Sequence, residues 1–410
     1  MNATKVLAFV MAGGEGKRLY PLTSERSKPA VPFGGRYRIV DFVLSNMVNS
    51  GIYSIYLLVQ YKSQSLIEHV RKSWAVSHLV PGHFVTVVPP QMRGGADWFQ
   101  GTADAVYQNL NLVYQNKPDI VAIFGADHVY RMDVRQMIKF HMEQNSDISV
   151  AVIPVPVNQS PMFGVAAVDS HSRICGFQEK PANPETIPGN PDRCLASMGN
   201  YLFNMKALFE ALEEAHGKQG NDFGQDVLPR IIDTHKVYAY DFASNKVPGV
   251  KSYEEQAYWR DVGTVDAYYQ AHKDLLALQP RFDEFNLEWP IYSGKYLGPA
   301  AKIIAGNIEN SRIGAGTVIN HATVRNSIIG RQVQIAENVN IEDSIVMDYT
   351  VIGKGARLRK VIVDRYNTIN PRTSIGYNRA TDSSYYFVTE SGLVVVAQGP
   401  RGPHLVYESG

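Results

Sequence analysis

The feature that most constrains the fold is a six-residue apolar repeat in the last quarter of the chain. Its apolar positions lie six residues apart with one step of five: Ile313 and Ile319, then Ile329, Ile335, Ile341, Met347, Ile352 and Leu358. A period of six fits neither an amphipathic helix nor a strand that alternates between two faces. It is typical of a parallel β-helix, which here would have three hexapeptides in each turn and about four turns. An irregular β-domain with coincidental spacing is the alternative.

Residues 1–278 show a different pattern, in which short apolar runs alternate with segments of helical spacing. The runs predict buried strands at Val6–Met11, Ile55–Val59, Val85–Val88, Ile120–Phe124 and Ile148–Val152. The segments between them predict helices at Val40–Ser50, Ser63–Lys72, Thr102–Tyr114 and Asp133–Gln144. Such alternation indicates an α/β domain with a mainly parallel sheet, helices on both faces, and ligands at the carboxyl ends of the strands. Residues 279–299, rich in proline, aromatic and turn residues, are predicted to form a linker.

Composition excludes several functional classes. The 410 residues include 40 Lys and Arg against 39 Asp and Glu, a net charge of +1 that excludes a basic nucleic-acid coat or an acidic tail. Two cysteines cannot form a disulfide framework or a cysteine-based zinc site, so a reducing compartment is expected. No apolar run approaches the roughly 18 residues of a membrane-spanning helix. We therefore expect a soluble, cytoplasmic protein with neither nucleic acid nor a membrane as partner.

A glycine-rich loop follows the first predicted strand, with glycines at Gly13, Gly14 and Gly16. Glycines let backbone N–H groups approach a phosphate closely. The loop is not a Walker A motif, because Arg18 stands where Ser or Thr would bind magnesium, and Leu19 replaces the third glycine of a Rossmann fingerprint. Basic residues follow with only Glu25 opposing them: Lys17, Arg18, Arg26, Lys28, Arg36 and Arg38. Such a cluster beside a glycine loop favours a polyphosphate ligand.

Several longer motifs occur along the chain in a fixed order. They are GGEGKRLYPLT at 13–23 with KPA at 28–30, FGGRYRIVDF at 33–42, LSN at 44–46, GTADAV at 101–106, FQEKP at 177–181 and YWRDVGT at 258–264. Together they resemble the sugar-1-phosphate nucleotidyltransferases, and among these the bacterial ADP-glucose pyrophosphorylase (glucose-1-phosphate adenylyltransferase) family. The resemblance covers nearly the whole chain. It implies a Rossmann-like nucleotidyltransferase domain over residues 1–278, followed by a left-handed parallel β-helix for regulation and oligomerisation over residues 300–410.

The resemblance also implies a reaction, in which ATP and glucose 1-phosphate give ADP-glucose and pyrophosphate with Mg²⁺ as cofactor. In this family ADP-glucose is the glucosyl donor for glycogen. An oxygen of the sugar phosphate attacks the α-phosphorus of ATP in line. This phosphate is already ionised near pH 7, since its second pKa is about 6. Catalysis would then require positioning and charge neutralisation, without a protein nucleophile.

By the same resemblance, Gly13, Gly14 and Gly16 contact the nucleotide phosphates. Arg18 and Lys28 draw the triphosphate toward the attacking oxygen, and Gln91 lies near the nucleotide base. Asp127 and Asp261 hold Mg²⁺, a cation that prefers carboxylate ligands, and Asp127 is counted with the catalytic residues. His128, next to Asp127, is interpreted as structural. The sugar phosphate contacts are Phe99, Gly164, Glu179, Lys180 and Ser197, although the family often has Tyr where this chain has Phe99.

Regulation and assembly are likewise implied by the resemblance. Family members are typically homotetramers controlled by anionic metabolites. Arg36 and Arg38, in the loop at 34–38, would bind the effector together with the β-helix, and many relatives have Lys in place of Arg36. Gln60 and Trp98 match positions that link the effector site to the catalytic site.

Three alternatives remain open. In the first, the β-helix carries a second, acyltransferase activity with His321 or His404 as base, as in some relatives. In the second, the nucleotidyltransferase uses another nucleotide or sugar, such as UTP, dTTP or mannose 1-phosphate. In the third, the chain is a non-catalytic regulatory subunit, although such a subunit would be expected to lose one of four charged residues that are all present here: Arg18, Lys28, Asp127 and Lys180.

Overall fold

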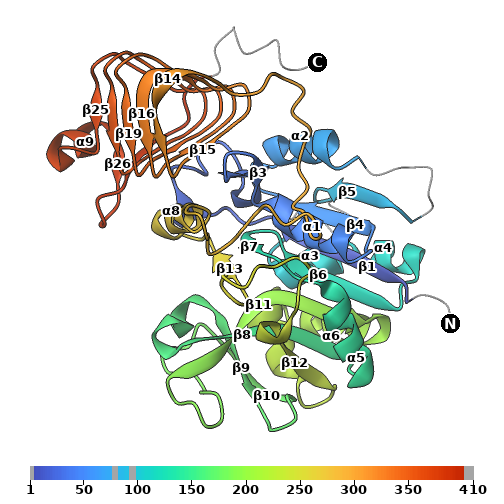
Figure 1. Cartoon of the computed structure of the whole chain (residues 1–410). Coiled ribbons are helices and arrows are strands. Elements are labelled where there is room, and N and C mark those ends of the chain that lie inside the picture. Colours follow the sequence, from blue (N-terminus) through green and yellow to red (C-terminus); the bar gives the residue numbers. More distant parts are fainter. Residues whose placement is uncertain (1–3, 76–81, 92–97, 401–410) are drawn as a thin grey trace.

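The computed structural model describes residues 4–75, 82–91 and 98–400. The N-terminal part forms an α/β domain, and the C-terminal part winds into a coil of short strands that lies against one side of it (Figure 1). Among the described residues, none of the helices is long and apolar enough to cross a membrane.

Four parallel strands form the first half of the central sheet. They lie in the order β5 (Phe84–Val88), β4 (Ser54–Val59), β1 (Val6–Ala12) and β6 (Ile120–Gly125). β1 and β6 at the centre consist almost entirely of buried apolar residues, as expected for parallel strands covered on both faces. The structure confirms these predicted strands and places the loop after β1 at the carboxyl edge of the sheet.

The long strand β11 (Arg193–Asn204) joins this half to the rest of the sheet. It runs antiparallel to β6 and to β8 (Ile148–Pro156), and its first half also pairs with β9 (Gly164–Val168). The remaining strands of the sheet are β10 (Ile174–Glu179), which pairs with β9, and β12 (Val237–Asp241), which pairs with β8. β11 therefore places residues from its middle beside the carboxyl end of β6.

Helices cover both faces of this sheet, as predicted. Three of the predicted helices are present with ends close to those expected: α1 (Val40–Asn49), α2 (Gln64–Ser73) and α5 (Val134–Glu143). The predicted helix at 102–114 is wrong in one respect, because it is divided into α3 (Thr102–Tyr107) and α4 (Leu110–Asn116). The Asn109 side chain donates a hydrogen bond to the Ala105 carbonyl at 2.8 Å, and such side-chain bonds compete with helical backbone bonds.

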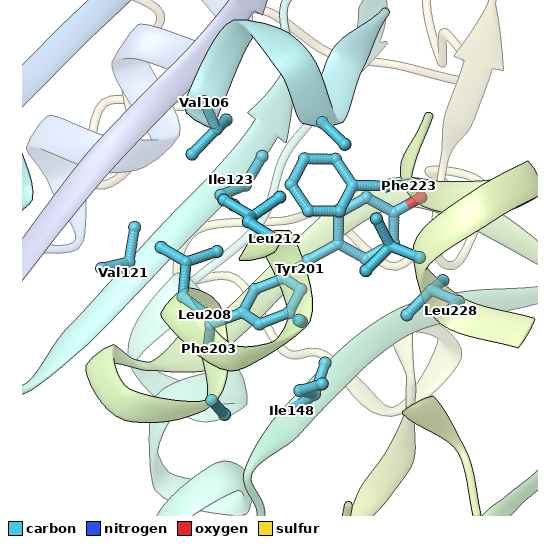
Figure 2. Packing of buried hydrophobic residues seen from close by; sticks show 14 of the residues in the cluster. Val106, Val121, Ile123, Ile148, Tyr201, Phe203, Leu208, Leu212, Phe223 and Leu228 are labelled. Carbon is cyan, nitrogen blue, oxygen red and sulfur yellow. The ribbon is translucent and has the colours of Figure 1, made fainter. Parts of the chain in front are cut away.

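The apolar core beneath α3 and α6 (Met205–Gly217) is shown in Figure 2. Val121 and Ile123 of β6 pack there with Leu208 and Leu212 of α6. The remaining elements of this domain are short: η1 (Lys17–Leu19), η2 (Lys28–Ala30), β2 (Pro32–Phe33), β3 (Tyr37–Arg38), β7 (His128–Tyr130), η3 (Val157–Met162), η4 (Phe223–Val227), α7 (Leu228–Ile231), η5 (Phe242–Ser244), β13 (Trp259–Asp261) and α8 (Val265–Lys273).

The C-terminal coil is a stack of parallel strands, which confirms the predicted β-helix. Its elements are β14 (Lys302–Glu309), β15 (Arg312–Ile313), β16 (Val318–Arg325), β17 (Ile328–Ile329), β18 (Gln334–Ile335), β19 (Asn340–Glu342), β20 (Ile345–Val346), β21 (Val351–Ile352), β22 (Arg357–Arg359), β23 (Val361–Val363), β24 (Thr368–Ile369), β25 (Ser374–Ile375), α9 (Arg379–Tyr385), β26 (Phe387–Val388) and β27 (Val394–Val396). Residues 279–299, which precede the coil, contain neither helix nor strand.

The predicted length of a coil turn is too long by one or two residues. Val318 pairs with Gln334, Gln334 with Val351 and Val351 with Thr368, so turns take 16 or 17 residues rather than three full hexapeptides. Each turn therefore has at least one step of five between inward-facing residues. For this reason Val346, and not Met347, points into the coil, whereas Met347 packs against the α/β domain.

A column of serines bonds successive turns of the coil to one another. Ser311 Oγ accepts the backbone N–H of Ser327, Ser327 Oγ accepts that of Ser344, and Ser344 Oγ accepts that of Val361. These bonds, of 3.0 to 3.2 Å, satisfy buried donors that lie outside the strand ladders. His321, the residue considered for acyl transfer, is exposed and bonds its neighbour Asn320, and His404 lies outside the described residues.

One face of the coil shares a hydrophobic core with the α/β domain. Ile328, Ile345 and Ile362 project from corresponding positions of three successive turns. They pack with aromatic side chains of the other domain: Phe33, Phe42, Tyr258, Tyr268 and Phe282. The fully buried Asp364 carboxylate also accepts a hydrogen bond from Arg26 across this boundary. The coil is thus held against the α/β domain by both apolar and ionic contacts.

Ile352 and its neighbour Val351 allow a matched test of the coil register. Ile352 is fully buried inside the coil, whereas Val351 is 43% exposed. Ile352→Ala should lower the free energy of unfolding by about 2–5 kcal/mol, because it leaves a cavity. Val351→Ala should cost less than about 0.5 kcal/mol. Urea unfolding followed by circular dichroism measures both losses, and losses of equal size would contradict this register.

Candidate functional site

A cavity of about 870 Å³ opens at the carboxyl ends of β1 and β6. We call it the glycine-loop cavity. It brings together most of the predicted site residues: Gly13, Gly14, Gly16, Arg18, Lys28, Gln60, Phe99, Asp127, Gly164, Glu179, Lys180, Ser197 and Asp261. Residues from widely separated motifs therefore line one space.

The glycine loop forms the first wall of this cavity. Gly16 has a left-handed backbone (φ 65°), and a Cβ there would lie 3.0 Å from the Cβ of Lys28, so a side chain at this position would be strained. Around Gly14, by contrast, no other atom lies within 4 Å of a Cβ position. The backbone at Gly14 is thus open to the cavity, as the predicted phosphate contact requires.

Two aspartates from distant motifs meet opposite this loop. β7 and β13 pair antiparallel with Asp261 opposite His128, and this register places Asp127 beside Asp261. Lys28 on η2 binds both carboxylates, with its Nζ 3.0 Å from Asp127 Oδ2 and 2.8 Å from Asp261 Oδ1. Burial raises the pKa of Asp127, but Lys28 and then His128 outweigh burial and hold that pKa well below its usual value. Asp127 is therefore a carboxylate at neutral pH.

This aspartate pair has the donor set of a divalent metal site. One ligand atom from each of Asp127, His128 and Asp261 lies within 4.8 Å of the other two. Two carboxylates suit a hard divalent cation, and the Lys28 ammonium supplies positive charge between them. His128 also packs on the Trp259 ring, with the ring centroids 5.0 Å apart. The residues present thus fit a divalent metal ion.

Arg18 lies at the edge of the aspartate pair. A Cβ on Gly263 would be 3.2 Å from Arg18 Nη2 and 3.0 Å from both carboxylate oxygens of Asp261, so these groups converge around Gly263. Arg18 is exposed, and among the described residues it forms no ion pair. Its guanidinium is available to an anionic ligand.

The opposite wall of the cavity comes from β9, β10 and β11. Gly164 lies opposite Glu179 in the β9–β10 pair, and a Cβ on Gly164 would be 2.6 Å from Phe177 and 3.0 Å from Glu179 Oε2. Lys180 Nζ contacts Glu179 Oε1 at 2.7 Å. Ser197 precedes the point where the register of β11 shifts. This wall offers one cation, one carboxylate and one hydroxyl to a ligand.

Sequence reasoning missed several lining residues, among them Tyr201, Asp222, Phe223 and Trp259. Asp222 accepts a hydrogen bond from Thr102 Oγ1 at 2.9 Å and caps η4 through the backbone N–H of Gly224. No motif quoted from the sequence contains Asp222. Trp259 does lie inside such a motif and could have been chosen from it.

Gln91 and Trp98 lie outside the lining of the glycine-loop cavity, whereas Gln60 lies in the lining and supports it. The exposed Gln91 side chain donates to the Pro89 carbonyl at 2.8 Å, and Trp98 is 53% exposed. Gln60 holds the backbone of Phe99 on both sides, accepting its N–H at 2.7 Å and donating to its carbonyl at 3.2 Å. Gln60 therefore positions Phe99 at the cavity.

A second cavity, of about 1320 Å³, lies between the loop at 34–36, the segment at 275–300 and the first turns of the coil. We call it the junction cavity. Arg36 lines it, whereas Arg38 does not. The Arg38 guanidinium instead bonds the Ala30 carbonyl at 3.3 Å and Ser65 Oγ at 2.7 Å. Arg38 thus links η2, which carries Lys28, to α2.

A buried histidine fixes the loop that lines the junction cavity. His272 Nε2 accepts the backbone N–H of Gly34 at 3.1 Å, while Nδ1 bonds the Tyr268 carbonyl at 2.9 Å. This arrangement requires a neutral imidazole with its proton on Nδ1. Burial lowers the pKa of His272 to about 4, in agreement with a neutral ring.

Comparison with known proteins identifies the family. The nucleotidyl transferase family model matches residues 7–277, and a model of a GlmU-like C-terminal hexapeptide domain matches residues 299–396. The chain is 54% identical to the glucose-1-phosphate adenylyltransferase of Thermodesulfovibrio yellowstonii, over 97% of both chains. The chain belongs to the glucose-1-phosphate adenylyltransferase family. Enzymes of that name from Anaeromyxobacter sp. and Thermus thermophilus are each 46% identical to it, over 97% and 98% of this chain and 99% and 100% of theirs.

Family membership agrees with the geometry of the glycine-loop cavity. A nucleotidyl transferase needs a phosphate-binding loop next to groups that neutralise charge, and here the loop faces Lys28, Arg18 and the aspartate pair. Enzymes of nucleotidyl transfer generally use a divalent metal, and the aspartate pair has the donor groups that such an ion prefers. The adenylyltransferase relatives extend over the coil as well as the α/β domain, so both parts belong to one family architecture.

Substitution of Lys28 tests the charge balance at the aspartates. Lys28→Met should lower the free energy of unfolding by roughly 1–3 kcal/mol, since two neighbouring carboxylates lose their cation while one of them remains partly solvated. MgCl₂ should then raise the unfolding temperature more in the variant than in the unmodified protein, because no ammonium competes with the metal. Differential scanning fluorimetry measures this, with the exposed Lys206→Met as control. An equal response to metal in all three proteins would contradict the site.

Acid should weaken the fold through His272. Between the usual histidine pKa of 6.5 and the folded value of about 4, the unfolded chain takes up a proton that folded His272 does not. The free energy of unfolding therefore falls as the pH falls through this window, by at most about 3 kcal/mol from this residue. In urea titrations at several pH values, His272→Gln should flatten the decline. The exposed His171→Gln should leave it unchanged, and a decline equally steep in all proteins would refute the assignment.

Proposed function

We propose that the protein transfers the adenylyl group of ATP to α-D-glucose 1-phosphate, forming ADP-glucose and pyrophosphate. The observation that carries the proposal is the composition of the glycine-loop cavity. One wall has a phosphate-binding loop with Lys28, Arg18 and two aspartates, and the facing wall has Glu179 and Lys180. Such a space can hold a triphosphate beside a phosphorylated sugar.

The nucleotide is assigned to the wall formed by the glycine loop. Backbone N–H groups at Gly13 and Gly14 bind phosphate oxygens, because both glycines line the cavity and no other atom lies within 4 Å of a Cβ position at Gly14. The Arg18 fork spans two oxygens, while the Lys28 ammonium acts as a point charge. Both groups stabilise the negative charge that develops on the departing pyrophosphate.

Mg²⁺ is the metal that we assign to Asp127 and Asp261. Their carboxylates match its preference for oxygen ligands. When bound, Mg²⁺ supplies positive charge that neutralises the reacting phosphates. Lys28, which contacts both carboxylates, then becomes available to the triphosphate.

Glucose 1-phosphate is assigned to the facing wall. Lys180 binds its phosphate. Glu179 accepts hydrogen bonds from its hydroxyl groups, and Ser197 donates one to them. Phe99 contributes an apolar surface. A phosphate oxygen attacks the α-phosphorus of ATP as the bond to pyrophosphate breaks. No residue has to remove a proton, because the attacking phosphate is already ionised. The residues act by holding the two substrates in line.

Regulation and assembly form a second part of the proposal. The junction cavity takes an anionic metabolite, for which Arg36 provides a cation. The protein is a cytoplasmic homotetramer whose ADP-glucose serves glycogen synthesis. Subunit contact is assigned to the open end of the coil, where β14 pairs on one edge with β16, has no strand on its other edge in the described part of the chain, and exposes Ile303 and Ile304.

Pyrophosphate release provides the decisive test. Purified protein with MgCl₂ and glucose 1-phosphate should release pyrophosphate with ATP, and far less with UTP or dTTP. Asp127→Asn should lower kcat by at least about 100-fold, because a metal ligand is lost. The exposed Asp192→Asn should leave kcat unchanged.

Other outcomes of this assay point to the alternatives. Preference for UTP or dTTP would overturn the assignment of the nucleotide while keeping the reaction type. No release with any nucleotide, in the presence of a range of phosphorylated and carboxylated metabolites, would indicate a non-catalytic regulatory subunit.

A further inference from the structure

The junction cavity contains an acidic side chain that faces its cations. Glu284 lies in the segment that precedes the coil, and its Oε1 contacts Arg312 Nη2 at 2.5 Å. Both side chains are largely buried, with 13% and 16% exposed. Glu284 also approaches the loop at 34–36, because its Oε2 lies 3.6 Å from the position that a Cβ on Gly34 would take.

This ion pair uses only part of the bonding capacity of its members. Glu284 Oε2 and Arg312 Nη1 are both buried, and neither has a hydrogen-bond partner within residues 4–75, 82–91 and 98–400. A guanidinium can bind an oxyanion through two parallel bonds, so Arg312 retains a free donor that a better-placed anion would satisfy. Burial raises the pKa of Glu284, against the opposing effects of Arg312, Arg36 and Arg131.

More positive charges lie around Glu284 than its single carboxylate can neutralise. Arg36 and Lys295 are exposed at the cavity and, among the residues that the structure describes, form no ion pair. Arg131 is already bound to Glu254 at 2.9 Å. A small metabolite that carries phosphate or carboxylate groups would therefore meet Arg36, Lys295 and the unused donor of Arg312.

The backbone beside Glu284 is anchored, so only its side chain is free to move. Asp283 donates its N–H to Glu254 at 2.8 Å, and the Asp283 carboxylate accepts the N–H of Phe285 at 3.0 Å. Tyr253 bonds the same carboxylate at 2.6 Å. Rotation of the Glu284 side chain can release Arg312 without rearrangement of this segment.

We propose that Glu284 is an internal counter-anion, which an anionic ligand displaces from Arg312 when it enters the junction cavity. This inference rests on the proposed regulatory role of the cavity. It assigns Arg312 as a ligand-binding residue and Glu284 as the group that sets the ligand affinity. The ligand gains an ion pair with Arg312 only when the Glu284–Arg312 ion pair is lost. The affinity of the native protein for the ligand is therefore lower than the number of cations in the cavity alone would give.

Titration with inorganic phosphate tests the inference without turnover. The unfolding temperature is measured against phosphate concentration, at constant ionic strength, for four proteins: the unmodified chain, Glu284→Gln, Arg312→Gln and the double variant. Glu284→Gln should respond to phosphate at concentrations lower by on the order of tenfold. This gain should vanish in the double variant, whereas phosphate bound in the glycine-loop cavity contributes equally to all four. Glu288→Gln, which removes a carboxylate of the same segment outside the cavity, should behave as the unmodified chain.

The outcomes separate this inference from the function on which it rests. A response weakened by Arg312→Gln but unchanged by Glu284→Gln would overturn the role of Glu284 and leave the regulatory site standing. No change in any variant would overturn both the role of Glu284 and the phosphate site. Adenylyl transfer is untouched by either result, since the titration requires no nucleotide. Should Glu284→Gln fail to fold, Glu284→Asp, which draws the carboxylate back from Arg312, should shift the response in the same direction.

Discussion

The packing of the coil on an aromatic cluster is the contact on which the rest of the arrangement depends. Each coil turn places one outward apolar residue at the same position, so Ile328, Ile345 and Ile362 form a straight apolar row. Tyr268 and Phe282 of the α/β domain pack in the same cluster as this row. Because the row is rigid, it fixes the first coil turns relative to the loop at 34–36, and the junction cavity between them has walls that belong to both domains. The coil buries its own apolar interior, and its outer face also forms part of the wall of the junction cavity.

Much of this fold could be predicted from the sequence, because its apolar periods are strong. The buried runs of β1 and β6 indicate strands, and the six-residue repeat favours a β-helix over an irregular β-domain. Met347 was misplaced because period counting cannot decide which of two adjacent apolar residues enters the coil; Val346 does so, and the step of five leads to it from Ile341. The interruption between α3 and α4 lies at Asn109, whose backbone is not helical (φ −115°, ψ 14°), and periodicity does not reveal it.

The candidate site was predictable where local motifs carry it and not where tertiary contacts do. Lys28 and Asp261 lie in quoted motifs and Asp127 follows a predicted strand, and the structure brings Lys28 within bonding distance of both aspartates. Arg38 lies in such a motif too, yet its guanidinium bonds Ala30 and Ser65 and does not line the junction cavity. A positive charge in the loop at 34–38 was therefore not enough to predict which side chain faces that cavity. Glu284 is the opposite case, because it lies in no quoted motif and its role follows only from the side chains around it.

Both cavities satisfy the same electrostatic requirement in the same way. A buried charge without a partner is costly, so a chain that is to bind a charged ligand has to neutralise the site while the ligand is absent. In the glycine-loop cavity the Lys28 ammonium stands between two carboxylates, with a charge of the same sign as a metal ion. In the junction cavity the Glu284 carboxylate stands against Arg312, with the sign of an anionic metabolite. If both proposals hold, ligand binding exchanges one ion pair for another at each site, and selectivity comes from how well the incoming ligand satisfies groups that the internal partner leaves unused.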